Sequence, residues 1–173
     1  TAGARLGWGG DRNYVAGIDF GLTDERVTRL ILGDRTRYVE HSVCPVDYYV
    51  PSVRVLLEAK FGDPVSARTT PPLCGEFAFD APGTAQGNWF QVGGTGFFES
   101  YAIALVRDNV LPSSRAMSIG TIGTAYDGAV LFFAEAGAGQ VRRAFDQVTA
   151  AGGVYCYDGL HLNPTLASGS AIT

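Results

Sequence analysis

The chain has few charged residues, almost no lysine and no long apolar run. Charged residues make up 17% of its 173 residues, below the roughly one quarter that is usual for globular domains. Among 13 basic residues only Lys60 is a lysine, and the formal net charge is −4. Because this balance gives no broad positive field, we expect no nucleic-acid partner. No run of about 18 apolar residues occurs, so we expect no transmembrane helix.

The N-terminal sequence also lacks the features of a secretory signal peptide. Residues 1–5 are Thr-Ala-Gly-Ala-Arg, and no apolar h-region is present. Thr1 is consistent with an N-terminus left by processing and equally with the start of a fragment.

Histidine is scarce, and the motifs of common catalytic sites are missing. His41 and His161 are the only histidines, and the absence of a Gly-x-Ser-x-Gly elbow argues against a Ser-His-Asp hydrolase. The glycine-rich stretch 93–96 lacks the Lys-Ser/Thr of a phosphate-binding loop. His41, Cys44 and Asp47 are spaced by three residues, but zinc would need a further ligand or a catalytic water. We therefore expect no metal, no cofactor and no catalytic residue set.

One segment, residues 51–61, has the periodicity of a helix. Proline at position 51 suits the first helical turn, and Gly62 suits the position just after the last one. Four apolar residues share one face of this helix: Val53, Leu56, Leu57 and Phe61. We expect that face to pack on a sheet or to close one end of a barrel.

The three cysteines have no Cys-x-x-Cys spacing. Cys44, Cys74 and Cys156 allow one disulfide and one free thiol, in three pairings. Cys44 and Cys74 flank the predicted helix, and a bond between them would fasten it to the rest of the fold, so we favour this pair. The alternative joins Cys74 to Cys156 across neighbouring strands. A disulfide predicts an extracytoplasmic location, which is the periplasm, the cell surface or the secreted fraction.

From Cys74 onward the hydrophobic pattern has a period of two, which is typical of β-strands. Turn sequences such as Pro82-Gly83 separate the alternating runs. Strands are predicted over residues 74–81, 87–92, 101–110, 115–121, 129–135, 141–149, 154–157 and 160–163. Short links between consecutive strands favour an up-and-down meander. The predicted fold class is mainly β: a single-domain antiparallel meander barrel of about eight strands, with one helix and an N-terminal arm.

Three segments make up this one predicted globular domain. Residues 1–43 form an N-terminal arm with short strands, residues 44–73 hold the helix and a loop, and residues 74–165 form the barrel. The arm contains strand-like pieces that have no place in an eight-stranded meander: 14–20, 27–32 and 36–43. Because an unpaired strand invites pairing with another chain, the arm is a candidate contact between subunits of an oligomer.

The stretch 80–90, Asp-Ala-Pro-Gly-Thr-Ala-Gln-Gly-Asn-Trp-Phe, follows Cys74-Gly75 and resembles a family of uncharacterised bacterial proteins. That family has a Cys-Gly strand followed by Pro-Gly-Thr-x-x-Gly-x-Trp. Further similar stretches extend the resemblance over about residues 40–158: 44–49, 105–109, 118–120 and 154–157. The resemblance implies a bacterial protein and no known activity. Gly87-Asn88-Trp89 is also similar to the Gly-x-Trp of lipocalins, which implies a tryptophan that closes one end of a barrel.

Polar side chains gather in the predicted turns at one mouth of the barrel. Polar groups above an aromatic interior are the default ligand site of such a fold. The candidate ligand-binding residues are Gln86, Asn88, Trp89, Arg107, Asp108 and Asn109. Glu76 and Asp80 share a strand face but lie roughly 13 Å apart by strand rise, too far for a glycosidase pair. We expect both to be solvated, or Asp80 to hydrogen-bond the turn backbone.

These observations favour binding over catalysis. The first hypothesis is a secreted or envelope-associated β-barrel protein that binds a small or extended ligand without turning it over. The first alternative is a structural or assembly subunit of an extracellular or multi-subunit complex. The second alternative is a barrel enzyme of the cyclase type, in which the cavity positions a reactive substrate. The expected partners are accordingly a small-molecule ligand or protein neighbours.

Overall fold

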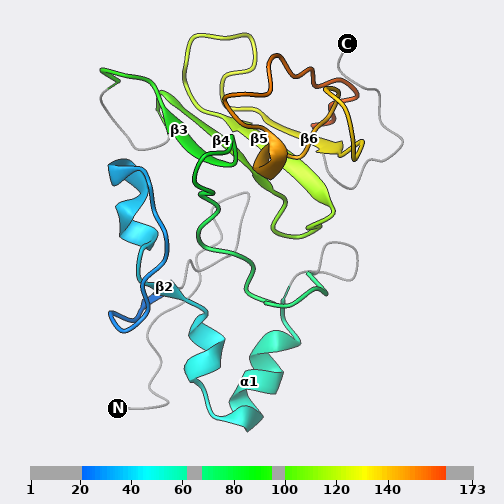
Figure 1. Ribbon diagram of the computed structural model, residues 1–173. Coiled ribbons are helices and arrows are strands. Elements are labelled where there is room, and N and C mark those ends of the chain that lie inside the picture. The colour runs from blue at the N-terminus through cyan, green and yellow to red at the C-terminus, as the bar shows by residue number, and fades with distance from the viewer. Residues whose placement is uncertain (1–20, 62–67, 95–99, 163–173) are drawn as a thin grey trace.

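Two antiparallel sheets contain the β-strands of the part of the chain that the structure describes. The computed structural model describes residues 21–61, 68–94 and 100–162. A four-stranded sheet occupies one end of the molecule, and a two-stranded sheet lies nearer the other end, beside a short α-helix (Figure 1). The fold is therefore mainly β with one short helix in the described ranges, as predicted. The strand predicted at 14–20 lies outside the described residues.

The four-stranded sheet is a meander in which each strand is antiparallel to the next. Its strands are β3 (Gly87–Phe90), β4 (Ala102–Arg107), β5 (Ser114–Ile119) and β6 (Val130–Ala134). They confirm the strands predicted at 87–92, 101–110, 115–121 and 129–135. The order is β3-β4-β5-β6, and no closed barrel forms among the described residues. The meander was thus predictable, whereas its closure is not seen.

Residues 74–81, predicted to be a strand, run as an irregular segment outside both sheets. Side chains replace the strand partners that the prediction required. The Asn109 side chain accepts a hydrogen bond from the Glu76 N–H at 2.8 Å and donates one to the Glu76 carbonyl at 3.1 Å. Gly75 has a φ of 76°, outside the β region. The alternating pattern of this segment therefore does not correspond to a paired strand.

The chain after β6 forms single bridges instead of the predicted strands at 141–149, 154–157 and 160–163. One bridge joins Val141 to Cys156, and another joins Phe132 of β6 to His161. Between the bridges lies the short 3₁₀-helix η3 (Phe145–Gln147). These bridges and side-chain packing hold this region against the sheet, and it adds no further strand.

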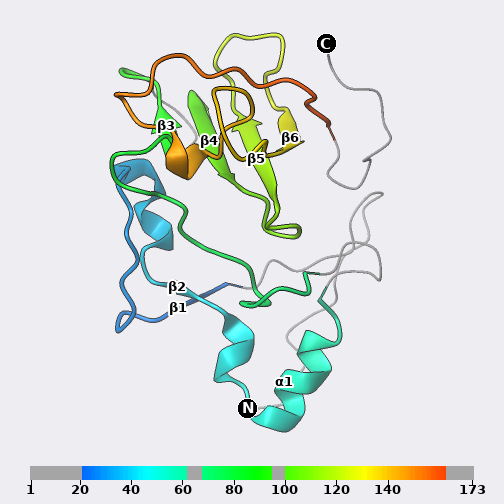
Figure 2. The same ribbon diagram turned by 45° about the vertical axis from the view of Figure 1, so that its right-hand side comes forward.

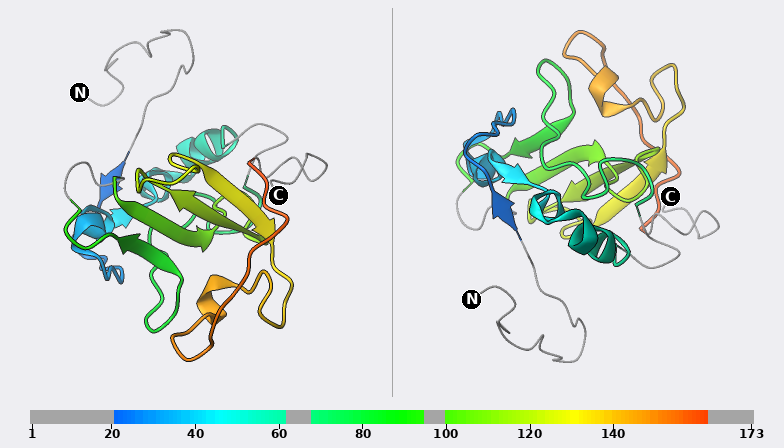
Figure 3. Two further views of the ribbon diagram at one scale, coloured as in Figure 1. Left: turned by 90° about the horizontal axis from the view of Figure 1, so that it is seen from above. Right: turned by 90° about the horizontal axis from the view of Figure 1, so that it is seen from below.

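The core lies between one face of the sheet and this returning chain. Leu131 and Phe133 on β6 are each 2% exposed, and Phe145 of η3 is 1% exposed. The Phe145 ring packs edge-on against Phe133, with centroids 5.4 Å apart, and the Tyr157 ring lies 5.0 Å from Phe133. Figure 3 shows the chain after β6, yellow to red, returning beside the strands.

The N-terminal part holds a small second sheet. Strand β1 (Leu22–Thr23) pairs with β2 (Ser42–Val43), and the 3₁₀-helix η1 (Asp34–Val39) lies between them in the sequence. The strand predicted at 27–32 does not form, and the one predicted at 36–43 survives only as β2. Thr36 explains the helical turn, because its N–H and its hydroxyl both donate to the carbonyl of residue 33, at 3.1 and 3.0 Å.

The helix α1 (Pro51–Glu58) confirms the predicted helix and its proline start, although it ends before residue 61. The prediction that its apolar stripe packs on a sheet or closes one end of a barrel is wrong. No residue of α1 is buried, and its main contact with a regular element is the 3₁₀-helix η2 (Pro45–Tyr48). Figures 1 and 2 both place α1 at the end of the molecule opposite the four-stranded sheet.

The predicted disulfide between Cys44 and Cys74 is present, with Cα atoms 5.6 Å apart. Cys156 is free and exposed. The bond joins the residue just before η2 to the irregular segment 74–81, so both ends of the segment that carries α1 are held together. The disulfide thus connects the helical end of the molecule to the chain that leads into β3.

Candidate functional site

The candidate site forms where the edge strand β3 begins, and the Asp80 carboxylate organises it. Its Oδ2 accepts a hydrogen bond from the Leu32 N–H at 2.8 Å, and its Oδ1 accepts one from the Asn88 N–H at 3.0 Å. Leu32 precedes Asp80 by 48 residues. Because hydrogen bonds to a carboxylate are strong, this side chain holds the N-terminal part of the chain against the edge strand. The sequence predicted that Asp80 is solvated or hydrogen-bonds the turn backbone. In the structure its carboxylate also bonds Leu32, far away in the chain.

A tight turn at Pro82-Gly83 brings the chain back from Asp80 into β3. The N–H of Ala81 donates to the Gln86 carbonyl at 3.1 Å and closes the turn. Gly87 follows with a φ of +134°, and a Cβ at this position would lie 2.6 Å from the Asp80 Oδ1. Only glycine fits here, so the Gly87-Asn88-Trp89 tripeptide marks the close approach of the Asp80 carboxylate to the β3 backbone.

The segment after η3 forms the remaining wall of the site. The N–H of Ala85 donates to the Val148 carbonyl at 2.8 Å and draws this segment against the turn. The Trp89 indole Nε1–H donates to the Ala85 carbonyl at 2.7 Å, which fixes the ring, yet 52% of the residue is exposed. A large apolar side chain is thus held in place while half of the residue stays exposed.

These elements enclose a cavity of about 590 Å³, called the Trp89 cavity below. Its mostly apolar lining includes Leu32, Asp80, Ala85, Gln86, Asn88, Trp89, Val148 and Ala150. The volume lies within the roughly 300–1,000 Å³ that is typical of small-molecule sites. The Gln86 side chain donates from Nε2 to the Phe79 carbonyl at 2.9 Å. Its buried Oε1 has no hydrogen-bond partner in the described part of the chain.

The six predicted site residues separate into two groups. Gln86, Asn88 and Trp89 line the Trp89 cavity together. Arg107, Asp108 and Asn109 instead make contacts within the fold. The Arg107 guanidinium pairs with the Asp146 carboxylate at 2.8 Å. Asp108 is buried and accepts from the two main-chain N–H groups of the turn after β4. Asn109 secures the backbone of residue 76, as described above.

The spacing of His41, Cys44 and Asp47 produces no metal-binding arrangement here. The Cys44 sulfur is bonded to Cys74, and the His41 Nδ1 lies 2.7 Å from the Val27 carbonyl oxygen. Within residues 21–61, 68–94 and 100–162, no three His, Cys, Asp or Glu side chains are grouped as metal ligands. The helices of these same ranges include none with the length and apolar character needed to cross a bilayer.

The Trp89 cavity offers an apolar surface and one aromatic ring, which are groups that bind a ligand. Sequence patterns did not reveal Leu32 or Val148 as part of it, because both reach the cavity through contacts with residues far away in the chain. Comparisons of the chain with protein-family models, with curated proteins and with solved structures find no significant match.

Proposed function

We propose that this chain is a non-catalytic extracytoplasmic binding protein whose ligand occupies the Trp89 cavity. The observation that carries this proposal is the half-exposed Trp89 side chain, which is anchored by its Nε1–H and lines a mostly apolar cavity. An exposed aromatic ring is a frequent binding group, because it offers large apolar area with little loss of side-chain freedom on binding.

The mostly apolar lining indicates the character of the ligand. The Gln86 Oε1 is buried, so it is not counted as a group that contacts the ligand. We infer a small ligand, or the end of an extended one, whose apolar group packs against Trp89. The Asp80 carboxylate is occupied by main-chain N–H groups, so its role is to hold the walls together.

The Cys44–Cys74 disulfide supports the proposed compartment. Disulfides form and persist in the periplasm, at the cell surface and in secreted proteins, and they are rare in the reducing cytosol of most cells. The bond encloses the segment that carries α1, which has no buried residue of its own. An oxidising location would therefore be needed for this end of the molecule to keep its structure.

Dye binding tests the Trp89 cavity. We expect 8-anilinonaphthalene-1-sulfonate to bind the wild type at one class of sites and to quench Trp89 emission in a Trp8→Phe background, where Trp89 is the only tryptophan. Trp89→Ala should weaken dye binding, followed by the dye's own fluorescence, by about tenfold or more. Loss of a large buried apolar contact costs about 1.5–3 kcal/mol.

The matched control is Val92→Ala, which shortens a fully exposed side chain just beyond β3 and should leave dye affinity unchanged. Equal dye affinity in the wild type and in Trp89→Ala would rule out this cavity as the site.

A second candidate function, a subunit of an assembly, is favoured by one observation. Large apolar side chains of η2, of α1 and of the link between them are exposed: Tyr48, Tyr49, Val50, Val55 and Leu56, the last 69% exposed. We call this surface the η2–α1 patch. Several exposed apolar side chains close together in the sequence are typical of an interface.

We infer that the partner at the η2–α1 patch is a second copy of this chain. The charges beside the patch sum to zero. Arg54 pairs with Asp47 at 2.9 Å and with Glu58 at 2.6 Å, and Lys60 supplies the second positive charge. A neutral, apolar surface does not repel its own copy, and it offers no charge to attract a strongly charged partner. Related copies would bury the same patch on both sides, as two-fold dimers do.

Leu56→Glu is expected to abolish this self-association. In sedimentation velocity, the wild type should shift from monomer to dimer as its concentration rises, whereas the variant should stay monomeric because an acid cannot be buried there unpaired. Val154→Glu adds the same charge at a 78% exposed site outside the patch and should dimerise like the wild type. A wild type that remains monomeric at every concentration would eliminate this candidate.

A further inference from the structure

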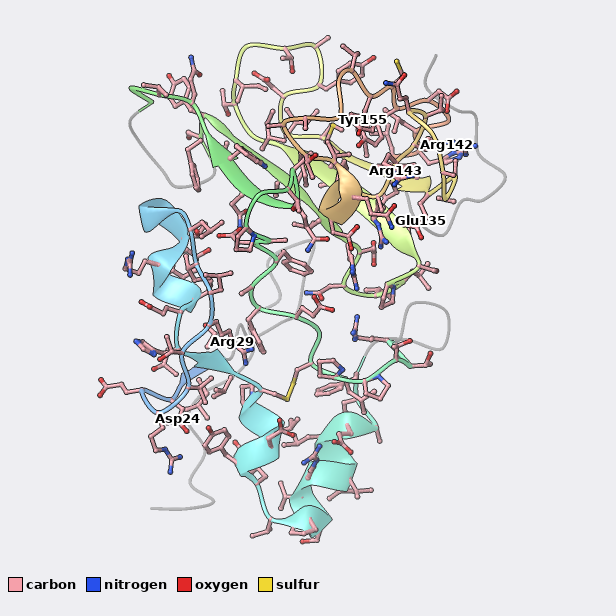
Figure 4. All side chains as sticks on the ribbon, viewed as in Figure 1. Asp24, Arg29, Glu135, Arg142, Arg143 and Tyr155 are labelled. Carbon is pink, nitrogen blue, oxygen red and sulfur yellow. A yellow bond between two sulfur atoms is a disulfide. The ribbon has the colours of Figure 1, made fainter. Side chains whose placement is uncertain are left out.

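A second cavity, of about 490 Å³, lies beside the disulfide and has a different character. Its walls come from the segment before η1, from β2 and η2, and from residues 72–78. Cys44 itself lines it, and the Cys44–Cys74 bond holds two of these walls together. We call it the Arg29 cavity. In Figure 4 Arg29 lies near β2, close to the yellow disulfide bond.

Arg29 presents a guanidinium group that is fixed but not neutralised. Its Nε–H donates to the Ser42 carbonyl at 2.7 Å, and its Cζ lies 5.1 Å from the centre of the Phe77 ring. The two terminal nitrogens have no hydrogen-bond partner among the described residues. A guanidinium that is fixed through its Nε–H and keeps the N–H groups of both terminal nitrogens free is suited to bind a carboxylate through paired hydrogen bonds.

Glu76 supplies the opposite charge in the same cavity. Its backbone is fixed on both sides by the Asn109 side chain, at 2.8 and 3.1 Å. Its carboxylate forms no ion pair within the described ranges, and in particular it lies beyond ion-pair distance of the Arg29 guanidinium. A positive and a negative group that do not pair with each other therefore line the same cavity.

The other polar groups of the Arg29 cavity are already engaged. Asp47 pairs with Arg54. The Tyr48 hydroxyl donates to the Asp24 carboxylate, which also binds Arg26, and this hydrogen bond raises the pKa of Tyr48. Of the charged residues that line the cavity, Arg29 and Glu76 alone remain without an oppositely charged partner in the described part of the chain.

We propose that the Arg29 cavity binds a small zwitterion of the α-amino acid class, with its carboxylate on Arg29 and its ammonium group on Glu76. A simple anion would be repelled by Glu76, and a simple cation would be repelled by Arg29. Val27, Val43 and Phe77 also line the cavity and give an apolar side chain a surface to contact. This site is separate from the Trp89 cavity, and it does not depend on the proposal made for that cavity.

Isothermal titration calorimetry with three probes of similar shape tests the proposal on the wild-type chain. They are L-leucine, a zwitterion; L-leucinamide, which keeps the ammonium group but has no carboxylate; and 4-methylpentanoate, which keeps the carboxylate but has no ammonium group. We expect leucine to bind at least about tenfold more tightly than either of the others, because each loses one charge-assisted contact. Equal binding of all three, or no leucine binding, would overturn the proposal.

Two variants assign the two contacts. Arg29→Gln should remove the preference for leucine over leucinamide, and Glu76→Gln should remove the preference for leucine over 4-methylpentanoate. Glu25→Gln, at an exposed site outside the cavity, should keep both preferences. Trp89→Ala should also keep them, which separates this site from the Trp89 cavity. Preferences that persist in Arg29→Gln and Glu76→Gln would refute the assigned roles, whatever their thermal stability.

Discussion

Replacing Phe133 with alanine is expected to lower the free energy of unfolding by about 3–5 kcal/mol, the usual cost of truncating a buried phenylalanine. Phe133 is 2% exposed and contacts two other rings, those of Phe145 and Tyr157. These rings belong to the chain that returns after β6, where single bridges replace a strand ladder. Because few backbone hydrogen bonds hold this chain to the sheet, the cavity left by the alanine cannot be filled without releasing it.

Urea unfolding followed by circular dichroism measures the effect. Val130→Ala on the same strand is the control, since Val130 is 38% exposed and should cost no more than about 1 kcal/mol. Hydrogen exchange on Phe133→Ala should show the main-chain amides of residues 140–160 losing protection first. A loss below 1 kcal/mol for Phe133→Ala would mean that the three rings are not the centre of the core.

The four strands of the meander could be predicted because their signal is local. β5 alternates in character, β4 and β6 are short, nearly continuous apolar runs, and turn residues such as glycine or proline lie beyond each strand, so pattern and turn agree. Closure into a barrel could not be predicted, because it depends on which residues later strands pair with. Phe145 and Tyr157 lie in runs whose pattern resembles a strand, yet in the structure their rings pack in the core while their backbones form no strand ladder.

The helix was likewise predictable as an element, whereas its packing partner was not. Amphipathic spacing predicted α1 and its start at Pro51, since proline and apolar periodicity act within the segment itself. The spacing says nothing about the partner of the apolar stripe. The structure leaves Val55 and Leu56 exposed, which no pattern within eight residues could indicate.

The candidate sites combine residues that sequence analysis placed far apart. Gln86, Asn88 and Trp89 were found because they adjoin the Pro82-Gly83 turn, and turns place polar groups at the surface. Leu32 enters the Trp89 cavity through a hydrogen bond to Asp80 across 48 residues. The sequence pattern around Arg29 predicts only a strand and indicates no binding role for this arginine. Its significance arises only from Phe77 and Glu76, which the disulfide brings to it.

The two ends of the molecule are stabilised differently. The four-stranded sheet has a ring-packed core, whereas the described residues of the end that carries α1 bury Val43 and Val46 and few other apolar side chains. The short length of α1 gives it little stability of its own, since isolated helices below about 12 residues are marginal in water. The Cys44–Cys74 bond is therefore the main constraint on this end, and its removal should act there first.

Removing that bond in a Cys44→Ser/Cys74→Ser variant is expected to cost about 3–4 kcal/mol, the unfolded-state entropy released when a cross-link over 30 residues is lost. The loss should appear mainly as local opening: hydrogen exchange over residues 42–61 and 68–78 should approach that of an unfolded chain, while β4 and β5 keep their protection. Binding of L-leucine in the Arg29 cavity should fall with it, because the disulfide holds the walls of that cavity together.

The comparison is best made in a Cys156→Ser background, so that the exposed free thiol cannot form a different bond. Cys156→Ser alone should match the wild type in stability and in binding, since the thiol is exposed and has no structural partner within the described ranges. If the double variant instead loses protection uniformly across β3 to β6, the sheet and the α1 end unfold as one unit, and the disulfide stabilises the whole molecule. Dye binding at the Trp89 cavity distinguishes the two cases, because it persists only if the sheet end stays folded on its own.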